Sequence, residues 1–123
     1  MKEQLFSQQI TFLHTSDLEM TRRFYSNRIG LPLVRDQKTC MIFRTAENAF
    51  LGFCSHIEPI SAGRKVILTL VCEDVDAWYE KLTSKGITTL NPPKTNPTYQ
   101  IYHFFFLDPN GYWIEIQRFD QPL

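Results

Sequence analysis

Hydrophobic and polar residues alternate along short segments of the first half of the chain, a pattern typical of half-buried strands. Residues 9–15 place Ile10, Phe12 and His14 on one side, so a strand is predicted there. Three further apolar runs are separated by polar clusters, and their spacing predicts a small antiparallel meander. These runs lie at residues 33–35, 40–44 and 49–54.

Between the first strand and this meander, apolar residues recur at the spacing of a helix, so a helix is predicted there. Ser16 is predicted to cap the helix, with Glu19 three residues later completing a capping box. Gly30 stands where a left-handed C-terminal cap is expected, and Pro32 prevents the helix from resuming. The apolar stripe of this helix consists of Leu18, Thr21, Phe24 and Tyr25.

The same order of elements returns after a polar connector at residues 55–64. An apolar, β-rich run precedes a helix that Glu73 or Asp74 opens and Gly86 ends. A short strand ending at Leu90, a Pro-rich loop and two strands joined by the turn DPNG complete this half. The run, the loop and the two strands span residues 66–72, 91–98, 101–107 and 112–119.

Two copies of a strand–helix–three-strand unit predict an α+β fold. Each copy is too small to bury its own sheet face. We therefore expect two βαβββ modules to form a curled mixed β-sheet cleft with the helices packed outside, and ligands to bind in that cleft. The chain is then one domain, with module one at about residues 8–54, the connector at 55–64 and module two at about 65–119.

Three segments resemble the vicinal oxygen chelate superfamily, the glyoxalase, bleomycin resistance protein and extradiol dioxygenase family. They are HTSDLEMTRRFYSNRIGLPL, VCEDVDAWYEKLTSKGI and FFFLDPNGYWIEIQ, and the last is similar to the superfamily's closing F-x-DP-x-G-x-x-x-E hairpin. The resemblance implies the glyoxalase-like fold. It does not imply one activity, because members catalyse isomerisation, ring cleavage or epoxide opening, or catalyse nothing.

The enzymes of this superfamily hold a divalent cation between the first and last strands of each unit. By resemblance, the four ligand positions fall on Ile10, Gly52, Ile67 and Glu115. Only Glu115 offers a ligand atom, and one carboxylate does not retain a hard divalent ion. We therefore expect no metal cofactor.

A non-standard metal set is the alternative. His14 lies four residues beyond Ile10, hence on the same face of the predicted strand. It would hold a divalent metal together with Glu115 and, in one version, Gln9. A protein of this kind would be a metal-dependent lyase, isomerase or dioxygenase.

Glu115 is the candidate catalytic residue. Its neighbours Ile114 and Ile116 are expected to point toward a helix, so its carboxylate is expected to point into the cleft. It would act as a general base or contact a cationic or hydroxyl-bearing ligand. Phe12 and Phe50 are expected to face it from the first half, making an aromatic slot for a flat ligand. The full candidate binding set is Glu115, Trp113, Gln117, His14, Phe12, Phe50, Ile10 and Ile67.

The remaining histidines and the cysteines are not assigned to the candidate site. The aromatic run around His103 hides its face, so burial is expected, and His56 in the connector is expected to be exposed. Three cysteines are odd in number and widely spaced, which favours buried thiols over disulfides. They are Cys40, Cys54, which follows Gly52 on the cleft side, and Cys72.

Composition narrows the function classes. Lys and Arg total 13, as do Asp and Glu, so no net charge exists to attract nucleic acid. No apolar stretch reaches the roughly 20 residues of a membrane span, and MKEQLFSQQ has no export signal pattern. A cytoplasmic protein is expected.

Three functions stay open. The first is a protein that binds a small organic molecule, such as an aromatic one, without the usual catalytic metal. The second is the metal-dependent enzyme described above, and the third is a non-catalytic interaction module whose cleft is filled by side chains. The resemblance further implies a homodimer.

Overall fold

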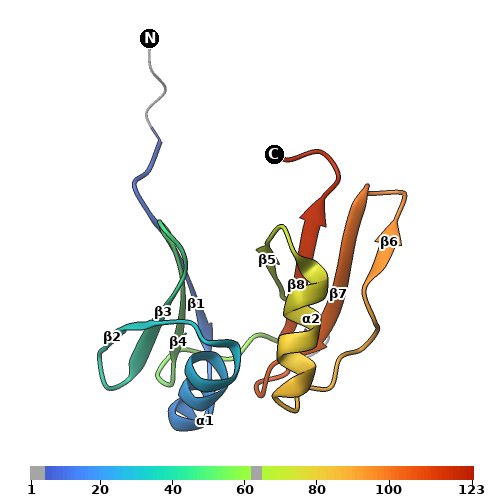
Figure 1. Ribbon diagram of the computed structural model, residues 1–123. Coiled ribbons are helices and arrows are strands. Elements are labelled where there is room, and N and C mark those ends of the chain that lie inside the picture. Colours follow the sequence, from blue (N-terminus) through green and yellow to red (C-terminus); the bar gives the residue numbers. More distant parts are fainter. Residues whose placement is uncertain (1–4, 62–64) are drawn as a thin grey trace. The chain divides into compact units, whose positions relative to one another are not determined.

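The computed structural model describes residues 5–61 and 65–123 (Figure 1). These residues divide into two compact units at the predicted connector. Each unit is a four-stranded mixed sheet with one helical segment of its own, so the predicted α+β fold is confirmed. None of the helices in the described ranges is long and apolar enough to cross a membrane.

The first unit follows the predicted order of strand, helix and meander. Its strands are arranged β1-β4-β3-β2, with β1 parallel to β4 and the other pairs antiparallel. Its elements are β1 (Gln9–His14), the helix α1 (Leu18–Arg22) with a π-helical continuation (Arg23–Ile29), β2 (Leu33–Asp36), β3 (Cys40–Ala46) and β4 (Ala49–Cys54).

The core of the first unit lies between its helical segment and one face of its sheet. The buried ring of Tyr25 has its centroid 4.6 Å from that of Phe53 and 5.6 Å from that of Phe43. Because strand side chains alternate, the neighbours Ile42 and Gly52 belong to the opposite face. That second face is available for a site.

The start of the first helix differs from the prediction. Asp17, in an extended conformation, is the N-cap, and its carboxylate accepts from the backbone N–H of Met20 at 3.0 Å. The helix therefore begins one residue after the Ser16 cap would have it, and Glu19 pairs with Arg22 instead of closing a capping box. Gly30 does end the segment in the left-handed conformation, with φ 92°.

The second unit repeats the strand order of the first, as β5-β8-β7-β6, which confirms the internal repeat. Asp74 caps its helix, and Gly86, with φ 84°, lies just beyond the helix end as predicted. The elements are β5 (Ile67–Val71), α2 (Val75–Ser84), β6 (Lys94–Asn96), β7 (Ile101–Leu107) and β8 (Trp113–Phe119).

The second strand of the second unit lies later than predicted. Instead of a strand ending at Leu90, one isolated bridge joins Thr89 to Phe106, and β6 lies inside the predicted Pro-rich loop. The three residues of β6 lie between Pro93 and Pro97. A proline-free stretch at a sheet edge tolerates flanking prolines, because its outer N–H groups need no partner strand.

The helix α2 covers one face of the second sheet. Tyr79 on α2 meets the Phe104 ring edge-on at 5.3 Å, and the Tyr102 hydroxyl donates to Asp76 at 2.6 Å. The buried strand residues on the helix side are Leu68, Phe104, Phe106, Ile114 and Ile116. The intervening residues of β8, including Glu115, are thereby directed to the other face.

The prediction of three free thiols is wrong. Cys40 and Cys54 form a disulfide across β3 and β4, where the two residues are directly paired with their Cα atoms 4.1 Å apart. The two cysteines are 14 residues apart in the sequence, and the pairing of their strands brings them together. Cys72 is the free, half-buried cysteine of the described residues.

Candidate functional site

The candidate catalytic residue Glu115 lies in the middle of β8 and is buried. Its two strand neighbours are β5, where Thr69 is its register partner, and β7, where Phe105 is. Trp113 and Gln117 share its face, as the alternation predicted. Central placement in the sheet brings side chains of three strands together around one carboxylate.

Both oxygens of Glu115 accept a hydrogen bond. Thr69 Oγ1 donates to Oε1 at 2.8 Å, and His103 Nδ1 donates to Oε2 at 2.6 Å. His103 Nε2 is buried and has no hydrogen-bond partner among the described residues. A neutral imidazole whose Nδ1–H is held by a carboxylate keeps a lone pair on Nε2, which is the arrangement of a proton-transfer group.

Aromatic rings continue from this cluster along the same face. The Phe105 ring lies 5.2 Å from the imidazole of His103 and 5.4 Å from the ring of Trp113. The ammonium of Lys65 lies 3.9 Å from the Trp113 centroid, a cation–π contact. Ile67, a candidate binding residue, is paired with Trp113 and is exposed.

The first unit has a pocket of its own on the sheet face opposite its helix. Its volume is about 510 Å³, within the range of small-molecule sites. Three predicted binding residues line it: Ile10, Phe12 and Phe50. The complete lining is Gln8, Ile10, Phe12, Val34, Arg35, Gln37, Ile42, Arg44 and Phe50.

Two arginines make this pocket basic. Arg35 comes from β2 and Arg44 from β3, and no carboxylate is among the lining residues. The Arg44 guanidinium lies 5.2 Å from the Phe50 centroid, and its Nη1 donates to the Glu47 carbonyl oxygen at 2.8 Å. These contacts hold Arg44 in place beside an aromatic face.

Neither arginine was among the binding residues predicted from the sequence, although strand alternation indicated the position of Arg44. Strand alternation in CMIFRT places Arg44 on the same side as Ile42, which is the side of Gly52. Arg35 is paired with Ile42 only because the register shifts between Leu33 and Arg35. Strand alternation therefore predicts the face of Arg44, whereas the register shift in the β2–β3 pair decides the face of Arg35.

The contact of His103 with Glu115 was not predicted from the sequence either. Counting outward from the predicted four-residue turn at 108–111 would place His103 opposite Ile116, on the other face of the sheet. In the structure Leu107 pairs with Trp113 instead, so five residues separate the paired strand ends and His103 lies opposite Gln117. That position puts the imidazole on the same face as Glu115, diagonally across the strand pair. The turn motif therefore did not predict this contact, because the observed connection is one residue longer than the predicted turn.

The family's four metal-ligand positions do not fit a divalent metal. Ile10 and Ile67 lack lone pairs, and both carboxylate oxygens of Glu115 already accept hydrogen bonds. Gly52 has no side chain, and a Cβ built there would clash with Cδ1 and Cε1 of Phe12. The Phe12 ring thus fills the space that a ligating side chain at position 52 would need.

His14, the other proposed metal ligand, has a partner in its own unit. Its Nδ1 donates to the carbonyl oxygen of Ile57 at 2.8 Å, and it does not line the pocket. Cys54, expected on the cleft side, is also absent from the lining. The metal set of His14 and Glu115 stays a prediction.

Comparisons with known proteins agree with this architecture. The family model of the Glyoxalase/Bleomycin resistance protein/Dioxygenase superfamily matches residues 8–116, whereas a search of curated proteins found no significant match. A glyoxalase/bleomycin resistance protein/dioxygenase from Nocardioides is 20% identical with TM-score 0.78, over 100% of this chain and 92% of that one. A superfamily member from Sphaerobacter thermophilus is 22% identical with TM-score 0.76, over 93% and 98%. A lactoylglutathione lyase from Agrobacterium tumefaciens is 19% identical with TM-score 0.73, over 89% and 90%. Because the family model spans most of the chain, the protein belongs to the Glyoxalase/Bleomycin resistance protein/Dioxygenase superfamily.

Proposed function

We propose that this protein binds a small, flat organic anion in the pocket of its first unit, without the divalent metal of the family's enzymes. The observation that carries the proposal is the pocket itself, about 510 Å³ in volume and lined by two phenylalanines and two arginines. Cofactor-free binding is supported by the ligand positions, which offer one already hydrogen-bonded carboxylate.

The lining residues favour an aromatic or conjugated carboxylate. Aromatic rings stack on planar ligands, and guanidinium groups bind carboxylates through paired N–H donors. Arg35 is exposed on β2, whereas Arg44 is held beside Phe50. A ligand carboxylate near these two side chains would place its ring against Phe12 or Phe50.

Binding of aromatic carboxylates and their matched neutral amides to the full chain, measured by calorimetry, tests this proposal. We expect the acids to bind and the amides to bind at least about 10-fold more weakly, as the loss of a charged hydrogen bond predicts. Arg35→Gln and Arg44→Gln should each weaken binding about 10-fold, while Arg28→Gln, an exposed arginine outside the pocket, should not. Equal binding of acid and amide, or unchanged affinity in both pocket variants, would overturn the proposal.

The absence of the family's metal has a separate test. Protein incubated with Ni²⁺, Mn²⁺, Fe²⁺ or Zn²⁺ and then dialysed is analysed for metal content. We expect no metal whose retention depends on Glu115. Stoichiometric metal that Glu115→Ala releases would establish the non-standard metal enzyme instead.

A second candidate function is metal-independent proton transfer. The hydrogen bond between His103 and Glu115, which orients an imidazole whose Nε2 has no partner among the described residues, favours this chemistry. His103→Gln would then abolish turnover of a carbonyl substrate, measured as exchange of its α-hydrogen with D₂O, whereas binding of aromatic acids in the pocket of the first unit should be unchanged. Exchange that persists in this variant would exclude the role.

We further propose a cytoplasmic homodimer, as the family resemblance implies. Light scattering on the purified chain is the measurement. We expect twice the monomer mass of 14.5 kDa, and the monomer mass would contradict the proposal.

A further inference from the structure

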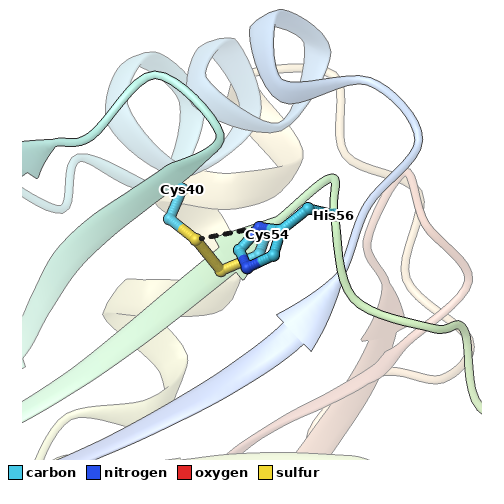
Figure 2. A group of neighbouring side chains, drawn as sticks. All are labelled: Cys40, Cys54 and His56. Carbon is cyan, nitrogen blue, oxygen red and sulfur yellow. Dashed lines mark hydrogen bonds between the residues drawn. A yellow bond between two sulfur atoms is a disulfide. The ribbon is translucent and has the colours of Figure 1, made fainter.

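Cys40, Cys54 and His56 form a cluster of soft donor atoms at one end of the first sheet (Figure 2). The two cysteines are cross-strand partners on β3 and β4, and His56 follows two residues after Cys54. His56 Nδ1 lies 3.7 Å from Cys40 Sγ, and all three donor atoms lie within 4.8 Å of one another. None of the three lines the pocket or occupies a family metal position.

We propose that reduction of the Cys40–Cys54 disulfide converts this cluster into a Zn²⁺ site with ligands Cys40 Sγ, Cys54 Sγ and His56 Nδ1. A water molecule or an external ligand completes the tetrahedron. The oxidised protein holds the disulfide and binds no zinc there, so the thiol redox state of the surroundings decides occupancy. The proposal is independent of the pocket and its ligand.

The geometry needs little rearrangement. Tetrahedral zinc, with Zn–S about 2.3 Å and Zn–N about 2.0–2.1 Å, requires donor atoms roughly 3.5–3.8 Å apart. The distance from Cys40 Sγ to His56 Nδ1 already meets this requirement. The two sulfurs must separate once their bond is broken, and rotation of both side chains about χ1 achieves this with the strand backbones in place.

The three proposed zinc ligands differ in their exposure to solvent. Cys40 and Cys54 are buried, which protects thiolates from competing ligands, and their strands are held in register by the β3–β4 ladder. His56 is exposed beyond the strand end, so its ring has room to adjust and the ion has a path of entry. Two thiolates and one imidazole suit zinc rather than a hard cation.

The reaction is balanced with a low-molecular-weight thiol as the reductant. Two thiol molecules each supply one electron and one proton. They leave joined as a disulfide, while the protein disulfide becomes two thiols. Zinc then displaces the two thiol protons, which pass to solvent. Disulfides persist in oxidising compartments and are rare in reducing ones, so each form has conditions in which it predominates.

The test uses Co²⁺ as a spectroscopic probe on the full chain, reduced with a phosphine that is then removed under anaerobic conditions. We expect one equivalent of Co²⁺ to bind the reduced protein with thiolate-to-cobalt charge-transfer absorption, and Zn²⁺ to abolish that absorption. The oxidised protein should show none. Cys40→Ser and Cys54→Ser should each remove the absorption, and His56→Ala should weaken Co²⁺ binding at least about 10-fold.

Cys72→Ser is the matched control, because Cys72 lies in the other unit and forms no disulfide. It should bind Co²⁺ as the wild type does. No charge-transfer band in the reduced wild type, loss of the band in Cys72→Ser, or unchanged affinity in His56→Ala would each overturn the proposal.

A second measurement avoids reliance on variants that fail to fold. Reduced wild-type protein is alkylated with and without Zn²⁺, and the modified cysteines are identified by mass spectrometry. We expect zinc to slow modification of Cys40 and Cys54 at least 10-fold and to leave Cys72 unaffected. Equal protection of all three cysteines, or of none, would contradict the site.

Discussion

The ring of Phe12 lies over Gly52, in the space that any side chain at position 52 would enter. The two residues are register partners on the parallel strands β1 and β4. Their contact joins two features of the protein. The Phe12 ring fills the space that a metal-ligating side chain at position 52 would need, and the same ring lines the pocket in which we propose that a ligand binds.

Gly52→Ala is expected to displace Phe12 and reshape the pocket. The added methyl group would clash with the Phe12 ring, and overpacking costs about 1–3 kcal/mol. We expect the lower end of that range because Phe12 is 45% exposed and can swing outward. Urea unfolding measures the cost, and ligand affinity should fall in the same variant.

The double variant Phe12→Ala/Gly52→Ala is the control. Without the ring, the methyl group meets no obstacle, so Gly52→Ala should cost less in this background than in the wild type. Equal costs in the two backgrounds would show that Phe12 is not the obstacle.

Glu115 and His103 are expected to be energetically coupled. Glu115→Met removes both carboxylate oxygens, one of which accepts from a buried imidazole, and an unsatisfied buried donor costs about 1–3 kcal/mol. In a double-mutant cycle with His103→Asn, the coupling free energy should exceed about 0.5 kcal/mol. Denaturant unfolding of the four proteins provides the measurement.

Thr69→Val provides the comparison for this cycle. Thr69 donates to the other oxygen of Glu115 from a more exposed position, so its loss should cost about 1 kcal/mol or less. Additive effects of the Glu115 and His103 variants would show that their hydrogen bond contributes nothing to stability.

Gly86→Ala should destabilise the protein through the backbone alone. Gly86 has φ 84°, and a Cβ built there has no heavy atom within 4 Å, so no packing change accompanies the substitution. A left-handed conformation costs an L-residue about 1–2 kcal/mol. Thermal unfolding measures the loss, and Gly86→Asn should lose less because asparagine tolerates this conformation. An alanine variant as stable as the wild type would contradict the assignment.

Cys72 is expected to react slowly with alkylating agents. Burial raises the pKa of its thiol, and the negative charge of Asp74 adds to the effect. A raised pKa lowers the thiolate fraction at a given pH, and the thiolate is the nucleophile. At pH 8 the alkylation rate should fall below that of free cysteine and recover as the pH rises.

Asp74→Asn separates the two causes, since asparagine keeps the helix cap. It should speed alkylation of Cys72 only modestly, because burial is the larger cause. A rate at pH 8 above that of free cysteine would contradict a raised pKa.

The sequence by itself determined the repeated βαβββ order, the face of Glu115 and the helix ends at Gly30 and Gly86. These depend on local rules. Alternation assigns the face of each strand residue, and a glycine accommodates the left-handed turn that ends a helix. The register that brings His103 to Glu115 is not among these features, because five residues separate the paired Leu107 and Trp113 instead of the four of the predicted turn.

Tertiary structure alone decided the pairings that depend on irregular strands. The register of β3 and β4 shifts between Arg44 and Ala46, and this shift places Cys40 opposite Cys54, whereas unbroken pairing would place it opposite Ser55. A comparable shift between Leu33 and Arg35 turns Arg35 toward the pocket. A bulge depends on the packing of both strands, so no local pattern in either one encodes it.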